Sequence, residues 1–264
     1  MRRLSFGPGR VLALSAAIAT LSFSLPSHAL ESPATNFPIG VNTALSALYP
    51  PAGSTEIYNY NVFYTAGSYK ADAGNPAPPS FKTNVFVEAF RINHTWFNIT
   101  PDLTFGSGAA INLIHQTLSL PGVRANLGIG FANPALIPVN LDWHPTQSFW
   151  AAGILNILPN VGTYDKKKVL NGSVGYTSYV PELAVTYFPM PKLEVSLDAR
   201  IDVNTKNHDT GYHSGNDFDL DYVVGYNPFP NLPHLQLAVN GYFFKQFSDD
   251  SLRSRINIIE LGFV

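Results

Sequence analysis

The clearest feature of the chain is a two-residue alternation of apolar and polar side chains. Residues 192–205 read K-L-E-V-S-L-D-A-R-I-D-V-N-T, so every second side chain is apolar. Because successive side chains of a strand point to opposite faces, this segment predicts a strand with one apolar and one hydrated face. The same pattern recurs in residues 56–66, 217–226 and 235–247. Weaker alternation predicts further strands at residues 85–97, 102–118, 126–143 (with breaks at Pro134 and Pro138), 149–158, 177–187 and 255–264.

The length of these segments and of their connections favours a membrane barrel. Strands of globular proteins usually have about 5–6 residues, whereas tilted membrane-spanning strands need about 9–11. Long polar connections at residues 67–84, 159–176 and 206–216 alternate with short ones at residues 98–101, 144–147 and 189–191. Outer-membrane barrels have short periplasmic turns and longer extracellular loops. The sequence therefore predicts an all-β, antiparallel transmembrane β-barrel of about ten strands, with its long loops outside.

In such a barrel the polar face of each strand lines the lumen and the apolar face contacts lipid. We expect charged residues of two neighbouring strands to face the lumen and to pair across it. These lumen-facing candidates are Asp198, Arg200, Asp202, Asp217, Asp219 and Asp221. Tryptophan and tyrosine favour the bilayer interface, so aromatic residues near strand ends predict an aromatic girdle. Its candidates are Trp96, Trp143, Trp150, Tyr187 and Tyr226.

Composition and motifs exclude several classes of function. The chain has no cysteine, which excludes disulfides, thiolate metal sites and cysteine nucleophiles, and its net charge of −2 gives no basic face for nucleic acid. The sequence contains no nucleophile-elbow, zinc-protease or dinucleotide-binding motif. Asp217, Asp219 and Asp221 have the spacing of a calcium loop but lie on a predicted strand, without its turn and glycine. We expect no catalytic residue, no cofactor and no metal.

The N-terminal 29 residues have the plan of an export signal. Three arginines precede an apolar run at residues 11–25, and Ser27 and Ala29 are small residues at the expected cleavage point. We therefore expect a cleaved signal peptide at residues 1–29 and an outer-membrane protein. Residues 30–55 lack a clear period, and we expect a periplasmic lead-in there in preference to a partial plug. Residues 56–264 form the predicted barrel.

Ordered motifs between residues 36 and 250 resemble one known family. They are Phe37-Pro38-Ile39-Gly40, Tyr49-Pro50-Pro51-Ala52-Gly53, residues 159–166 (P-N-V-G-T-Y-D-K), residues 181–187 (P-E-L-A-V-T-Y) and residues 204–215 (N-T-K-N-H-D-T-G-Y-H-S-G). With these motifs the chain resembles the bacterial outer-membrane family named for the meta-pathway of phenol degradation. The resemblance implies a β-barrel, with 12 strands in a full-length member, that handles aromatic or other hydrophobic compounds and has no catalytic residues to carry over. This chain has one predicted strand after Asp249-Asp250, so the sequence leaves open whether its barrel closes completely.

The expected function is passive transport or binding of small hydrophobic or aromatic compounds across the outer membrane. The expected partners are the bilayer, its outer-leaflet lipid and the solute. One alternative is a structural or adhesion barrel with an occluded lumen. Another is a soluble periplasmic β-sandwich, whose strands would also alternate; an outer-membrane enzyme ranks last because no catalytic constellation supports it.

Overall fold

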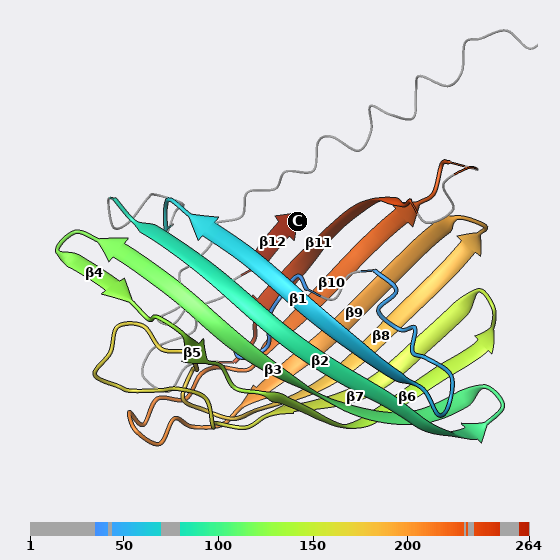
Figure 1. The fold of residues 1–264 in the computed structure, drawn as a ribbon, viewed down its shortest axis with the longest axis horizontal. Helices are drawn as coiled ribbons and strands as arrows, with labels where there is room; N and C mark the ends of the chain where they lie inside the picture. The colour runs from blue at the N-terminus through green and yellow to red at the C-terminus, as the bar shows by residue number, and fades with distance from the viewer. Residues whose placement is uncertain are drawn as a thin grey trace, which may run out of the picture.

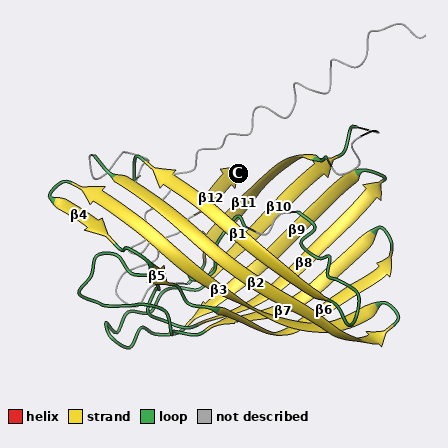
Figure 2. Ribbon diagram, viewed as in Figure 1, coloured by secondary structure: helices red, strands yellow, loops and turns green. Residues whose placement is uncertain are grey.

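The computed structural model describes residues 35–41, 44–69, 80–229, 231, 235–248 and 259–263. The predicted signal peptide lies outside the described residues. The described part forms one curled antiparallel sheet with its connecting turns and loops (Figure 1, Figure 2). No helix in these ranges is long and apolar enough to cross a membrane.

The sheet is a meander in which consecutive strands pair with one another. Ten strands follow in order: β1 (Thr55–Ala66), β2 (Lys82–Thr100), β3 (Leu103–Leu120), β6 (Ala135–Thr146), β7 (Phe149–Leu158), β8 (Ser178–Met190), β9 (Leu193–Asn204), β10 (Asp217–Tyr226), β11 (Leu237–Gln246) and β12 (Ile259–Phe263). Two short strands, β4 (Val123–Asn126) and β5 (Gly130–Phe131), pair with β3 beside this path. The all-β prediction of about ten antiparallel strands is confirmed.

The sheet curls into a half-barrel with two edges, formed by β1 and β12 (Figure 1). Within the described ranges no strand ladder joins β1 to β12. The described strands thus form an incompletely closed barrel, which is one of the two outcomes that the sequence allowed. The curl gives the sheet a concave and a convex face, and the two differ sharply in chemistry.

Polar side chains occupy the concave face and apolar side chains the convex face. On β9 the alternate residues from Glu194 to Asn204 are buried polar groups, whereas Leu197, Ile201 and Val203 between them are exposed. A soluble sheet packs its apolar face inward, so a chain that buries aspartates and exposes leucines has the opposite arrangement. Transmembrane barrels show this inverted alternation. The prediction that most apolar faces look outward is confirmed, and a sandwich of two sheets packed through their apolar faces is excluded for the described strands.

The first strand, β1, is an exception to this rule. In residues 56–66 the tyrosines alternate with Asn59 and Asn61, so the rule that the apolar face contacts lipid would turn the tyrosines outward. Instead, Tyr58 and Tyr60 lie on the concave side, opposite Arg91 and Ala89 of β2. Ile57 and Phe63 point outward and are 75% and 80% exposed. The physical reason is the phenol hydroxyl, since Tyr58 donates a 2.6 Å hydrogen bond to Glu56 on the same inner face. Tyrosine can serve either side of such a sheet because it is both apolar and hydrogen-bonding.

The region of residues 126–143 is divided differently from the prediction. A break falls before β6, next to Pro134, but Pro138 lies inside β6 and does not end it. The ladder between β6 and β7 shifts register between Leu136 and Val139, so Pro138 occupies an irregular position of the strand. A proline has no N–H to donate and is tolerated where a bulge leaves that ladder position unpaired.

Gly108 marks a close approach of two strands. A Cβ added there would lie 2.5 Å from the carbonyl oxygen of Ile92 and 2.5 Å from Oδ1 of Asn93, whereas a Cβ at Gly153 would meet nothing within 4 Å. We expect Gly108→Ala to lower the free energy of unfolding by about 1–3 kcal/mol because the backbone must shift. Gly153→Ala, on the open face of β7, is the matched control and should change it by less than about 0.5 kcal/mol. Urea unfolding in detergent measures both, and equal effects of the two substitutions would refute the close approach.

Candidate functional site on the concave face

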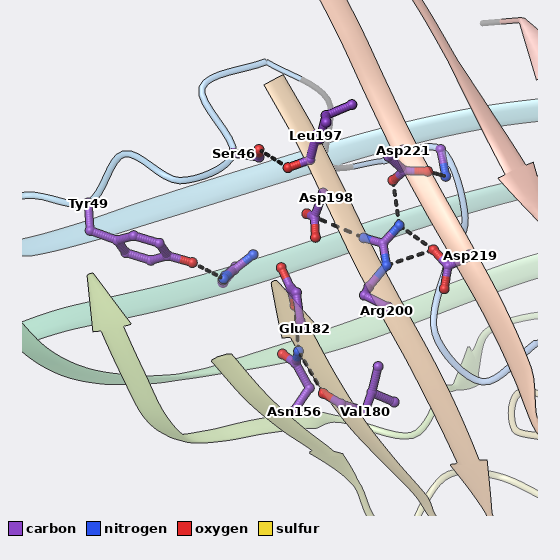
Figure 3. Close-up of polar contacts among 12 residues, drawn as sticks. Ser46, Tyr49, Asn156, Val180, Glu182, Leu197, Asp198, Arg200, Asp219 and Asp221 are labelled. Carbon is purple, nitrogen blue, oxygen red and sulfur yellow. Dashed lines mark hydrogen bonds and ion pairs between the residues drawn. The ribbon is translucent and has the colours of Figure 1, made fainter. Parts of the chain in front are cut away.

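A buried cluster of charges lies where β9 and β10 pair. Arg200 stands directly opposite Asp219 in the ladder. Its Nε donates to Asp219 Oδ1 at 2.7 Å, its Nη2 lies 2.7 Å from Asp221 Oδ2, and its Nη1 lies 3.5 Å from Asp198 Oδ2 (Figure 3). The Arg200 guanidinium therefore interacts with three carboxylates at the same time. Arg200 is fully buried, and the ring of Phe37 lies 4.7 Å from its guanidinium carbon.

All six charged residues singled out from the sequence lie buried on the concave face. They are Asp198, Arg200, Asp202, Asp217, Asp219 and Asp221. Even-numbered residues of β9 share this face with odd-numbered residues of β10 because of the register. The ion pairs run between adjacent strands or along one strand, which corrects the expectation that they cross the lumen.

Further polar residues of the concave face were not singled out from the sequence. Asn156 of β7 donates a 2.5 Å hydrogen bond to Glu182 of β8 (Figure 3). Glu194 of β9 accepts from Ser196 at 2.6 Å and from Gln236 at 2.8 Å. Their position in the two-residue alternation was the available signal, since Glu182 and Glu194 both occupy polar-face positions of predicted strands.

An apolar strip lies beside the charged cluster on the same concave face. It is built by inward-facing residues of β6, β7 and β8 and by residues of the N-terminal segment. One buried group contains Ala47, Ile137, Ala152, Ile154 and Ala184, and a second contains Phe37, Ala135, Leu158 and Val180. The concave face therefore offers two chemistries side by side, an apolar strip on β6–β8 and an acidic strip with one arginine on β8–β10.

The N-terminal segment, residues 35–41 and 44–54, lies against this concave face. Asn36 donates to Ser178 at the start of β8, and Gly40 N–H donates to Asp221 at 2.8 Å. Leu45 N–H donates to Glu194 at 2.6 Å, and Ala47 N–H to Thr186 at 3.3 Å. Since Ser178 begins β8 and Thr186 lies near its end, the segment runs along the strand from the long-loop end of the sheet to the short-turn end.

Tyr49 joins this segment to β2. Arg91 Nη2 of β2 donates to the Tyr49 hydroxyl at 3.2 Å (Figure 3). The Tyr49 ring packs on the apolar strip. Burial raises the pKa of Tyr49 well above its usual range, against the opposing effect of the Arg91 charge. The phenol therefore stays neutral at any physiological pH. The segment links β2 on one side of the curl to β8–β10 on the other.

The aromatic residues expected in a girdle divide into two groups. Trp96, Trp143, Tyr187 and Tyr226 lie on the convex face near the short-turn ends of β2, β6, β8 and β10, and are 44% to 53% exposed. Trp150 is a correction: it packs against the buried apolar strip and stacks on His144 with ring centroids 4.7 Å apart. Both faces of β7 carry apolar side chains, so the alternation did not reveal which face Trp150 occupies.

A single meander with a polar concave face and an apolar convex face has the architecture of a transmembrane β-barrel. The chain belongs to the family described as "Putative MetA-pathway of phenol degradation", which matches residues 66–263. Its fold is similar to the crystal structure of an outer membrane channel from Pseudomonas putida F1, with a TM-score of 0.67 and 17% sequence identity. That similarity covers 81% of this chain and 78% of the channel. No protein with a curated description matches the chain.

Removal of the central arginine tests the charge cluster. We expect Arg200→Met to lower the free energy of unfolding by about 3–5 kcal/mol, because three buried carboxylates lose their cation. Arg124→Met, at an exposed position of β4, is the matched control and should be near neutral. Adding Asp219→Asn to Arg200→Met should recover part of the loss in a double-mutant cycle. Strictly additive effects in urea unfolding would contradict the proposed coupling.

Proposed function

We propose that this protein is a passive outer-membrane channel for small hydrophobic compounds, including aromatic ones. The fold, the family and the similarity to an outer membrane channel support the channel class and the location. The nature of the solute is inferred from the concave face. No catalytic step and no cofactor are part of this proposal.

The apolar strip on the concave face is the observation that carries the choice of solute. Barrels that pass water-soluble solutes have polar interiors. Here Ile137, Ile154 and Val180 face inward next to Phe37 and Tyr49. An apolar solute that leaves water gains about 25 cal/mol for each Å² of apolar surface buried. The strip is covered by the N-terminal segment in the structure, so it binds such a solute when that segment moves off it.

The neighbouring polar groups suit solutes with one polar end. A phenol presents an apolar ring and one hydroxyl, which resembles the side chain of Tyr49. Tyr49 itself sits with its ring on the apolar strip and its hydroxyl on Arg91. The solute would move between these two chemistries down its own concentration gradient, with no energy source.

A structural barrel with an occluded lumen is the second candidate, and one observation favours it. The N-terminal segment is held on the concave face by hydrogen bonds to β8, β9 and β10. A segment that stays there permanently narrows or closes the lumen. Flux of labelled phenol into proteoliposomes separates the two candidates, since only a channel gives flux above that of protein-free vesicles.

Lipid contact of the convex face predicts a position-dependent cost of charge. Leu183, in the middle of β8, is 56% exposed on that face. We expect Leu183→Arg to make the free energy of folding into lipid vesicles less favourable by about 2–4 kcal/mol, as for arginine at the bilayer midplane. Val169→Arg, at a loop position that is 63% exposed, is the control and should change it little. Equal behaviour of the two variants would argue against burial of the convex face in lipid.

Uptake by cells tests the solute class. In cells that lack the chromosomal gene, the wild-type chain should restore uptake of labelled phenol or toluene at limiting concentration. Ile154→Asn should reduce this uptake because it places an amide in the apolar strip. Val169→Asn, outside the strip, should restore it fully. Undiminished uptake in cells without the gene, at the same outer-membrane level of other proteins, contradicts the proposed function.

A further inference from the structure

Three buried carboxylates converge between β9 and β10. Asp202, Asp217 and Asp219 each offer an oxygen within 4.8 Å of the oxygens offered by the other two. None of the three residues is more than 5% exposed. Asp202 and Asp217 stand directly opposite each other in the ladder, where like charges repel. A sheet holds such a pair only if something neutralises it.

Each of these aspartates has a buried oxygen that has no hydrogen-bond partner. Of the three, Asp219 is oriented by a hydrogen bond from Nε of Arg200 to its Oδ1. Among the described residues, no donor reaches Oδ1 of Asp202, Oδ1 of Asp217 or Oδ2 of Asp219. Buried carboxylate oxygens without a donor are costly, and carboxylates that bind a metal are typically oriented by such hydrogen bonds to their other atoms.

The nearby arginine does not neutralise this cluster. Arg200 forms ion pairs with Asp198, Asp219 and Asp221. In the described part of the chain neither Asp202 nor Asp217 has an ion pair with a basic side chain. A further positive charge at the three unpartnered oxygens would both relieve the repulsion and complete their coordination.

We propose that Asp202, Asp217 and Asp219 bind a divalent cation, Ca²⁺. An all-carboxylate donor set suits hard cations. Ca²⁺ takes several protein carboxylates in a flexible geometry, whereas Mg²⁺ keeps several waters and is usually bound through one or two carboxylates. A cluster of three protein carboxylates therefore suits Ca²⁺ better than Mg²⁺. The site goes beyond the proposed transport function.

Calcium binding by the full-length protein tests this directly. The protein is purified from membranes in detergent, stripped with EDTA, dialysed and titrated with CaCl₂ or MgCl₂ in a calorimeter. We expect one Ca²⁺ per chain, with a Kd no weaker than the approximately millimolar values of extracellular calcium modules. We also expect a rise in the melting temperature with Ca²⁺ that exceeds the rise with Mg²⁺ at the same concentration.

Variants separate this site from non-specific binding to detergent or lipid. Asp202→Asn/Asp217→Asn should weaken Ca²⁺ binding at least tenfold and abolish the calcium-dependent rise in melting temperature. Asp142→Asn, which alters a buried aspartate on the concave side of β6, is the matched control and should retain both. Heat-modified migration on gels confirms that each variant is folded, and the single variant Asp217→Asn replaces the double variant if that one does not fold.

Two outcomes overturn the proposal. One is a wild-type protein that binds no calcium, which would leave the two opposed aspartates to share a proton. The other is equal calcium binding by the wild-type and the aspartate variants. Neither outcome bears on phenol flux, which is measured separately, so failure of this site and failure of the proposed function are distinguishable.

Discussion

Along a paired strand, each side chain has only two directions available, and this constraint shapes the whole molecule. Between the edges β1 and β12 the backbone hydrogen bonds of the meander are satisfied between strands. The sequence therefore determines only which side chains face the concave side and which face outward. On β8, β9 and β10 that choice places Glu182, Arg200 and Asp219 inside and Leu183, Leu197 and Val224 outside. Low solvent exposure therefore coincides with charge, the reverse of the rule in soluble proteins. The same alternation sets the acidic strip, the apolar strip and the aromatic row near the short turns.

Charges inside the curl require donors, and the N-terminal segment supplies many of them. Its backbone N–H groups reach Asp221, Glu194 and Thr186, three acceptors on three strands. Among the described residues, Arg200 is the only basic side chain that forms ion pairs with the aspartates of β9 and β10. The segment and the acidic strip are therefore mutually dependent, because each satisfies polar groups that the other buries.

Much of the sheet was readable from the sequence, and the exceptions have physical causes. The segments predicted at residues 149–158 and 217–226 coincide with β7 and β10, and the clear alternation of residues 192–205 identified β9. The face of Trp150 was predicted wrongly because β7 is apolar on both faces. The tyrosines of β1 face inward against expectation because a tyrosine hydroxyl can hydrogen-bond to polar groups of the concave face, as Tyr58 does to Glu56. The N-terminal segment has no period, and its partners lie 139 to 181 residues away, so no local pattern announces them.

The position of that segment constrains the order of assembly. It precedes β1 in the chain, yet its contacts with Glu194 and Asp221 require β9 and β10, which are made much later, because Gly40 and Asp221 are separated by 181 residues. Contacts of such long sequence separation form slowly and late in folding. The N-terminal segment therefore gains these contacts only after β8, β9 and β10 have formed, although it leaves the ribosome before them. Docking of the first described residues is in this sense a late step of assembly.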